Sequence, residues 1–233
     1  MSEVDLHKAM ISTVAQALGP ELLSQVAFVG GCTTALLITD DYTREQVRHT
    51  KDVDLIVPAI GHAEWHQLQT QLRKRGFRDI VTADAPICAL YLGELRVDFM
   101  PHDERILGFS NRWYADALAS AEPYQIGGET EIRLVTPPYF VATKLEAYKG
   151  RGKQDPLASQ DIEDILNLVS GRDTLTQEIA HAPSEVRQYM SEELRCLLTH
   201  AAMAHAIEGC AHGQPGMSDL IYQRLDAIIA QQN

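Results

Sequence analysis

Long apolar runs are missing from this 233-residue sequence: no stretch approaches the roughly 18 consecutive apolar residues that a membrane-spanning helix needs. The N-terminal residues also lack the basic region and apolar segment of a secretory signal. Apolar residues still make up 45% of the chain and charged residues 22%, which is ordinary for a globular protein. We therefore expect a soluble, cytoplasmic protein with no membrane partner.

Cysteine is scarce as well, and its positions show neither a C-x-x-C pair nor a regular spacing. This pattern is typical of buried thiols rather than of disulfides or zinc ligands. The cysteines are Cys32, Cys88, Cys196 and Cys210.

Positive charge is under-represented, with 20 Lys and Arg residues against 32 Asp and Glu residues and a formal net charge of −12. Tight non-specific binding to a polyanion draws most of its free energy from cations that meet phosphates, so this balance argues against it and no DNA partner is expected. A nucleic-acid partner would need a local basic patch. Residues 73–75 and the stretch from Lys149 to Lys153 are the two candidates.

The apolar pattern divides the chain into an α/β part and a helical part. Strand-like runs occupy residues 26–29, 77–81, 87–92 and 95–100, besides the strand around Asp54. Helical spacing predicts helices over residues 3–18, 33–38, 62–75, 139–148, 159–169, 183–207 and 218–230, and residues 39–50 look irregular. We expect a mixed α/β sheet domain over residues 1–135, then a C-terminal helical bundle over residues 136–233.

The triplet Asp52-Val53-Asp54, inside an apolar run, is the first indication of chemistry. Residues i and i+2 of a strand point to the same side, so both carboxylates project together while Val53 enters the core. Buried carboxylates are costly unless they are neutralised or coordinated, and a pair of Mg²⁺ ions is the usual answer in phosphoryl transfer. A surface strand with alternating acids is the competing interpretation.

Gly30-Gly31 follows a strand and opens a helix. Such a turn offers free backbone N–H groups to a phosphate and has no side chains to keep it away. Thr33 or Thr34 would add a hydroxyl to the same phosphate. An ordinary turn is the alternative.

Asp98 lies in the alternating run L-R-V-D-F-M, after the tight connection Gly93-Glu94. It should stand mid-strand, beside the sheet that carries Asp52 and Asp54. Three acids can hold two metal ions, with Asp98 also assisting deprotonation of an acceptor. An exposed strand acid is the alternative.

Together these motifs resemble the minimal nucleotidyltransferase (polymerase-beta-like) superfamily, and more narrowly the AbiEii-type nucleotidyltransferases of bacterial toxin–antitoxin and phage-defence systems. The resemblance covers residues 26–170. It rests on F-V-G-G at 28–31, D-V-D at 52–54, R-V-D-F at 96–99, A-T-K-L-E-A-Y at 142–148 and S-Q-D-I-E-D-I at 159–165.

The resemblance implies that Lys144 contacts the nucleotide phosphates, where a cation stabilises charge that moves to pyrophosphate. It implies that Asp161 orients Lys144 or contacts the nucleotide, with Asp164 as the adjacent candidate.

The sequence departs from the family pattern in two places. The segment between Gly31 and Asp52 is longer than is typical, so residues 39–49 are expected to form an extra loop over the site. Many relatives have Ser where this chain has Gly31, which leaves the phosphate contact to backbone amides and to Thr33.

The expected activity is a Mg²⁺-dependent transfer of a nucleoside monophosphate from an NTP such as ATP to an acceptor hydroxyl. The resemblance implies tRNA or protein as acceptor and a cognate antitoxin as partner. A small-molecule acceptor, as in antibiotic-modifying relatives, and a catalytically silent binding module are the alternatives. His62 and His66 are spaced like metal ligands but lack a third, so we expect surface histidines, and we expect Trp113-Tyr114 in the core.

Overall fold

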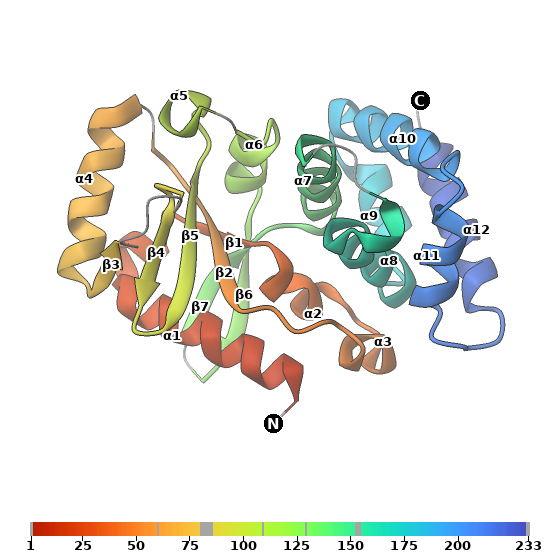
Figure 1. Ribbon diagram of the computed structural model, residues 1–233, viewed down its shortest axis with the longest axis horizontal. Coiled ribbons are helices and arrows are strands. Elements are labelled where there is room, and N and C mark those ends of the chain that lie inside the picture. Colours follow the sequence, from red (N-terminus) through yellow and green to blue (C-terminus); the bar gives the residue numbers. More distant parts are fainter. Residues whose placement is uncertain are drawn as a thin grey trace. The chain divides into compact units, whose positions relative to one another are not determined.

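The computed structural model describes residues 2–59, 61–79, 86–108, 110–128, 130–151 and 155–231. The chain forms two compact units (Figure 1). We call them the sheet unit, which comprises Met1–Thr33 and Arg48–Thr136, and the helical unit, which comprises Thr34–Val47 and Pro137–Asn233. The class is mixed α/β, as the sequence predicts.

The sheet unit is built on a seven-stranded mixed sheet of order β3-β4-β5-β2-β1-β7-β6. Its strands are β1 (Ala27–Val29), β2 (Asp52–Val57), β3 (Phe77–Asp79), β4 (Ala89–Leu92), β5 (Leu95–Pro101), β6 (Glu122–Gly127) and β7 (Thr130–Leu134). Its helices are α1 (Glu3–Leu23), the 3-10 turn η1 (Gly31–Thr33), α4 (Gly61–Lys74), α5 (Glu104–Leu107) and α6 (Tyr114–Ala119). Two pairs, β2 with β5 and β1 with β7, are parallel, and the other neighbours are antiparallel.

Helix α1 begins with a capping box, in which Ser2 and Asp5 each accept a hydrogen bond from the other's backbone N–H. The helix kinks at Gly19, whose φ of 66° is in the left-handed region, and continues from Pro20. The sequence predicts that this helix ends at residue 18. Instead, the chain changes direction at Gly19 and the helix continues to Leu23. Its buried side, with Ile11, Val14 and Leu18, packs against β2, β6 and β7.

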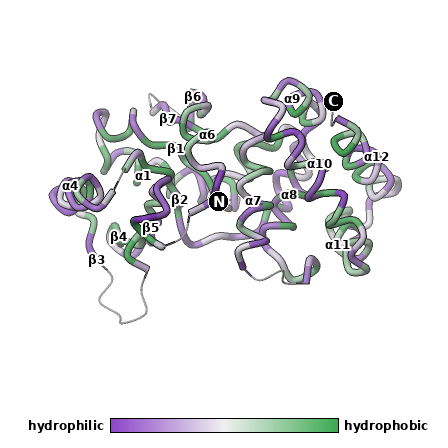
Figure 2. The backbone as a smooth tube through the Cα atoms, turned by 90° about the horizontal axis from the view of Figure 1, so that it is seen from above, coloured by the Kyte–Doolittle hydropathy of each residue, from purple (hydrophilic) through white to green (hydrophobic). Residues whose placement is uncertain are grey.

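The helical unit contains α2 (Thr34–Leu37), α3 (Asp41–Glu45), α7 (Pro137–Gly150), the 3-10 turn η2 (Pro156–Ala158), α8 (Gln160–Gly171), α9 (Leu175–His181), α10 (Ser184–Leu198), α11 (Met203–Cys210) and α12 (Met217–Ile229). Helix α8 is central, since α3, α7, α11 and α12 all pack against it. Figure 2 shows hydrophobic and hydrophilic residues alternating along these helices, as expected when each buries one side. Within the described residues, none of the helices combines the length and apolar character needed to span a bilayer.

Two expectations about local structure were wrong, and one pair of strands was not predicted. Residues 39–50 are not wholly irregular, because Asp40 caps α3 by accepting hydrogen bonds from the Thr43 N–H and hydroxyl at 2.7 and 2.8 Å. The single helix expected over residues 183–207 is two, α10 and α11, because the Thr199 hydroxyl donates back to the Cys196 carbonyl and the chain turns there. The hairpin of β6 and β7 was not predicted; β6 is mostly exposed, whereas Ile132 and Leu134 of β7 are buried.

The segment between the glycine turn and the first aspartate also behaves differently from the expected loop. Residues 34–47 belong to the helical unit, where α2 and α3 pack on α8. Gly171 of α8 permits this contact, since a Cβ there would lie 2.7 Å from Ile38 and 2.8 Å from Thr43.

Candidate functional site

The predicted aspartates lie on two neighbouring strands of the sheet unit. In the parallel pairing of β2 with β5, Asp54 is the register partner of Asp98, and Asp52 is the partner of Arg96. Partner residues on adjacent strands point to the same side of a sheet, as do residues i and i+2. Asp52, Asp54 and Asp98 therefore project from one face.

The glycine turn meets this face directly, because Val29 of β1 pairs with Asp54 of β2. Gly30 has a φ of +82°, and a Cβ built there would lie 1.9 Å from the Asp54 carboxylate oxygen Oδ2. No other residue type fits this position, for reasons of both backbone conformation and space. The fold therefore brings the glycine motif and the aspartate motif into contact.

Asp98 is held by a residue that sequence reasoning passed over. Arg96 donates from Nε and Nη2 to the two Asp98 oxygens at 2.8 and 2.7 Å, and these bonds raise the pKa of Arg96. The R-V-D spacing could have revealed it, since i and i+2 share a strand face. Because Arg96 engages both Asp98 oxygens, a cation that binds Asp98 competes with this ion pair.

A second unpredicted arginine lies beside the glycine turn. A Cβ on Gly31 would be 2.6 Å from Nη2 of Arg48, so the small residue leaves room for a guanidinium. Two residues on, the Thr50 hydroxyl donates to Oδ1 of Asp52 at 2.5 Å. The segment before β2 thus contains Arg48, whose guanidinium is a group that commonly binds phosphate. It also contains Thr50, which holds the Asp52 carboxylate by a hydrogen bond.

The two threonines expected to bind phosphate are buried. The Thr33 hydroxyl donates to the Gly30 carbonyl at 2.8 Å and so supports the turn. Thr34 begins α2 with its hydroxyl enclosed. The helix after the turn has only four residues, so its dipole adds little. Backbone amides and arginines are thus better placed than the hydroxyls to bind a phosphate.

Buried Cys88 lies close to the same acids. Burial, together with the negative charges of Asp98 and Asp54, raises the pKa of its thiol to about 11. The thiol is therefore neutral at physiological pH and serves as core. Cys32 and Cys210 are buried thiols as predicted, whereas Cys196 is exposed, contrary to expectation.

Lys144 is a buried residue of the helical unit, 8% exposed. Its Nζ contacts Asp164 Oδ2 at 2.6 Å and Asp161 Oδ1 at 3.3 Å. Asp161 is also paired with Arg151, and these two residues line an open pocket of about 310 Å³ together with Tyr148 and Ser159. The structure thus places Asp161 and Asp164 where each can orient Lys144.

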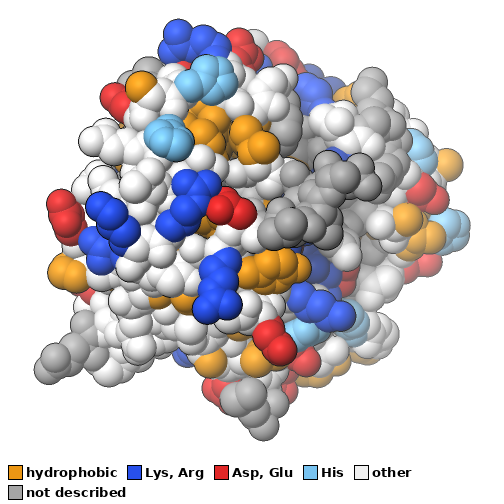
Figure 3. Space-filling view, turned by 60° about the vertical axis from the view of Figure 1, so that its left-hand side comes forward, with side chains coloured by type: hydrophobic (Ala, Val, Ile, Leu, Met, Phe, Trp, Pro, Cys, Tyr) orange, Lys and Arg blue, Asp and Glu red, His pale blue; other side chains and the backbone are white. Residues whose placement is uncertain are grey.

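The two basic segments are largely neutralised by acidic neighbours. Lys149 contacts Glu193 at 2.6 Å, while Arg73 makes a two-pronged pair with Asp79 at 2.8 Å. Figure 3 shows Lys and Arg side chains scattered over the visible face among uncharged and acidic ones. Residues 152–154 of the second segment lie outside the described residues. Neither segment, as described, presents the contiguous positive surface that an RNA backbone favours.

Among the other candidates, Trp113 is core, at 2% exposure, as predicted, whereas Tyr114 is half-buried, contrary to expectation. His62 and His66 both lie exposed on α4, which also agrees with the prediction. No protein-family model matches the chain, and a search of curated proteins found no significantly similar sequence.

Proposed function

We propose that this protein is a Mg²⁺-dependent nucleotidyltransferase of the polymerase-beta-like, AbiEii type, acting in a toxin–antitoxin or phage-defence role. The supporting observation is the contact of Gly30 with Asp54, combined with the pairing of Asp54 and Asp98 on parallel strands. Three motif elements from separate parts of the sequence meet on one sheet face, which a coincidental D-x-D would not require.

The donor set fits magnesium. Three carboxylates on one face are hard oxygen ligands, and the glycine turn leaves space beside Asp54 that any side chain would fill. Asp52, Asp54 and Asp98 would hold Mg²⁺, with two ions expected. When bound, Mg²⁺ neutralises phosphate charge and makes the acceptor hydroxyl more acidic.

The chain's own residues would position the donor and move a proton. The acceptor oxygen forms a bond to the α-phosphorus while the bond from that phosphorus to the β-phosphate oxygen breaks, so pyrophosphate leaves. Asp98, once released by Arg96, accepts the proton of the acceptor hydroxyl. Arg48 beside Gly31 and the freed Arg96 supply cations for the triphosphate.

Of the two macromolecular acceptors that the resemblance implies, protein is favoured over tRNA. The net charge is −12, and Lys149 and Arg151 of the second basic segment are already paired with acids. A hydroxyl on a protein side chain requires no extended cationic surface. A small-molecule acceptor remains the runner-up because it too avoids that requirement.

The decisive experiment incubates the protein with each α-³²P-labelled NTP, Mg²⁺, and separate tRNA, protein and aminoglycoside fractions, and follows label transfer. We expect transfer with wild type, none with Asp54→Asn, and wild-type transfer with Glu94→Gln, an exposed acid at the tip of the β4–β5 hairpin. Calorimetric titration with NTP and Mg²⁺ accompanies it. Absence of binding in the wild type would instead support a silent binding module.

A further inference from the structure

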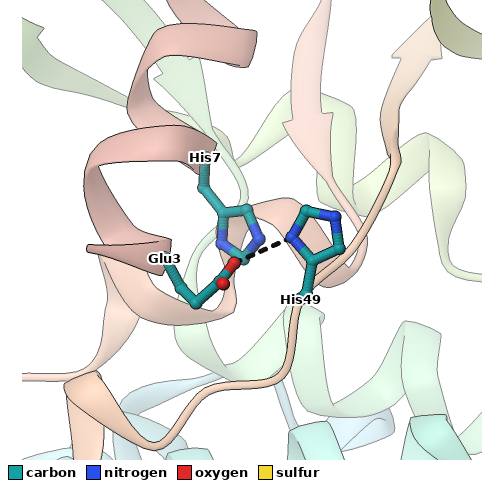
Figure 4. A group of neighbouring side chains, drawn as sticks. All are labelled: Glu3, His7 and His49. Carbon is teal, nitrogen blue, oxygen red and sulfur yellow. Dashed lines mark hydrogen bonds and ion pairs between the residues drawn. The ribbon is translucent and has the colours of Figure 1, made fainter. Parts of the chain in front are cut away.

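A second cluster of ligand-type side chains lies at the start of the sheet unit, outside the aspartate site. Glu3 and His7 come from α1, and His49 comes from the segment before β2 (Figure 4). One ligand atom from each residue lies within 4.8 Å of the other two. Among the described residues, this is the group of three that meets that criterion; the three aspartates do not.

Helix α1 supplies two of the three side chains of this cluster, and helical periodicity brings them together. Glu3 and His7 are four residues apart and share one side of α1, whose first turn is fixed by the capping box of Ser2 and Asp5. His49 completes it from a distant part of the sequence. Its Nδ1 lies 2.8 Å from Glu3 Oε2, and its ring stacks on that of His7 at 6.2 Å between centroids.

The donor set selects a class of metal. Two imidazoles and one carboxylate suit zinc and neighbouring transition metals, whereas Mg²⁺ prefers oxygen ligands alone. His7 is fully buried, while the side chains of His49 and Glu3 are 41% and 45% exposed, so an ion can enter from the solvent side.

One nitrogen of His7 is already in the form that a metal requires. The Thr50 backbone N–H donates to His7 Nε2 at 3.3 Å, so this nitrogen carries a lone pair and no proton. The contact is long for a hydrogen bond, and a metal bond to Nε2 would replace it.

We propose that Glu3, His7 and His49 bind one divalent transition-metal ion of the zinc class, with water in the remaining coordination positions. The ion joins α1 to the segment that leads into β2. That segment also positions the first aspartate, because the Thr50 hydroxyl donates to Asp52. The site is chemically separate from the Mg²⁺ site and does not depend on nucleotidyl transfer.

The test uses full-length protein with its native N-terminus and no histidine tag, titrated with Co²⁺ as a spectroscopic probe and with Zn²⁺ in competition. Wild type is expected to bind one Co²⁺ with visible d–d absorption that Zn²⁺ abolishes. His49→Gln and Glu3→Gln, both partly exposed and therefore tolerable to the fold, should each weaken binding about 100-fold, an effect on the scale seen when metal-site residues are lost.

Two matched controls separate this site from others. His62→Gln removes a histidine that also has a partner four residues away, on α4, and should leave the Co²⁺ titration unchanged. Asp54→Asn should also leave it unchanged. The proposal is overturned if wild type binds no Co²⁺, if His49→Gln binds it as tightly as wild type, or if His62→Gln weakens it equally.

Discussion

The sheet unit and the helical unit each contain a cluster of charged side chains, and the two clusters differ in balance and in burial. In the helical unit, Lys144 and Arg151 face Asp161 and Asp164, so formal charges cancel, and both acids are buried. Buried charges must be paired to be tolerated, and here they are paired within the chain.

In the sheet unit three carboxylates stand beside two guanidinium groups, those of Arg48 and Arg96. Acid is in excess, Asp52 and Asp54 are half-buried, and the Arg96 side chain is 39% exposed. Solvent and ligands can therefore reach this cluster, and a further cation would lower its free energy. The difference favours our proposal that a ligand binds the cluster of the sheet unit, and it favours a stabilising role for the cluster of the helical unit.

The largest expected effect is a loss of stability when the charged cluster of the helical unit is broken. Asp164→Ala leaves Lys144 buried with less compensation and should lower the free energy of unfolding by about 3–5 kcal/mol. Asp54→Asn removes one of several like charges and should change it by less than about 1 kcal/mol. Urea unfolding of both variants measures the contrast, and equal losses would show that the two clusters do not differ in this way.

The second largest expected effect is a loss of stability when the contact between Gly30 and Asp54 is disturbed. Gly30→Ala forces a left-handed backbone on alanine and places its Cβ against Asp54, which together should cost about 3 kcal/mol. Gly108→Ala is the control, because Gly108 also has a positive φ of 76° but nothing within 4 Å of a Cβ. The difference in unfolding free energy isolates the clash; if the two variants lose the same amount, Asp54 does not press on Gly30 in solution.

The third effect is a loss of stability in alkali. Burial raises the pKa of Cys88 and of Cys210 from 9.0 to about 11, so the folded protein keeps both thiols neutral after the unfolded chain has ionised. Each therefore contributes stability that is complete below pH 9 and is lost as pH rises towards about 11, at most about 2.7 kcal/mol per thiol.

Urea unfolding at pH 8 and pH 10.5 measures this loss, and the Cys88→Ala and Cys210→Ala variants should each reduce it. The two thiols should differ in one respect. Asp98 raises the pKa of Cys88 but is not among the causes for Cys210. Asp98→Asn combined with Cys210→Ala should therefore shrink the remaining alkaline loss, and an unchanged loss would contradict the influence of the acids on Cys88.

The smallest effect concerns competition between Arg96 and a metal ion for Asp98. Arg96→Gln removes the competing cation and should tighten Mn²⁺ binding about tenfold, or about 1.4 kcal/mol. Arg73→Gln is the control, because Arg73 makes a pair of the same geometry with Asp79. Electron paramagnetic resonance counts free Mn²⁺; weaker binding in Arg96→Gln would mean that the arginine supports the site rather than competing for it.

Several features were predictable because they depend on local patterns. The strand with Asp52 and Asp54, the hairpin around Gly93 and the cap of α8 by Ser159 all follow from alternation, turn chemistry and capping preference. These signals act over a few residues, so the sequence alone displays them.

Other features depend on contacts between distant segments. Residues 34–47 leave the sheet unit because α3 packs on α8, where Gly171 makes room. The partnership of His49 with Glu3 and His7 likewise spans more than forty residues of sequence. No short-range pattern encodes such contacts.

The sequence alone determined which residue types are available: two aspartates and an arginine–aspartate pair on strands, a double glycine, and a lysine in a helix. Strand periodicity fixed the faces to which they point. Tertiary structure decided which of them meet, because the order and register of strands set Asp54 against both Gly30 and Asp98, and because burial turned Lys144 from an ordinary helix lysine into an enclosed ion pair.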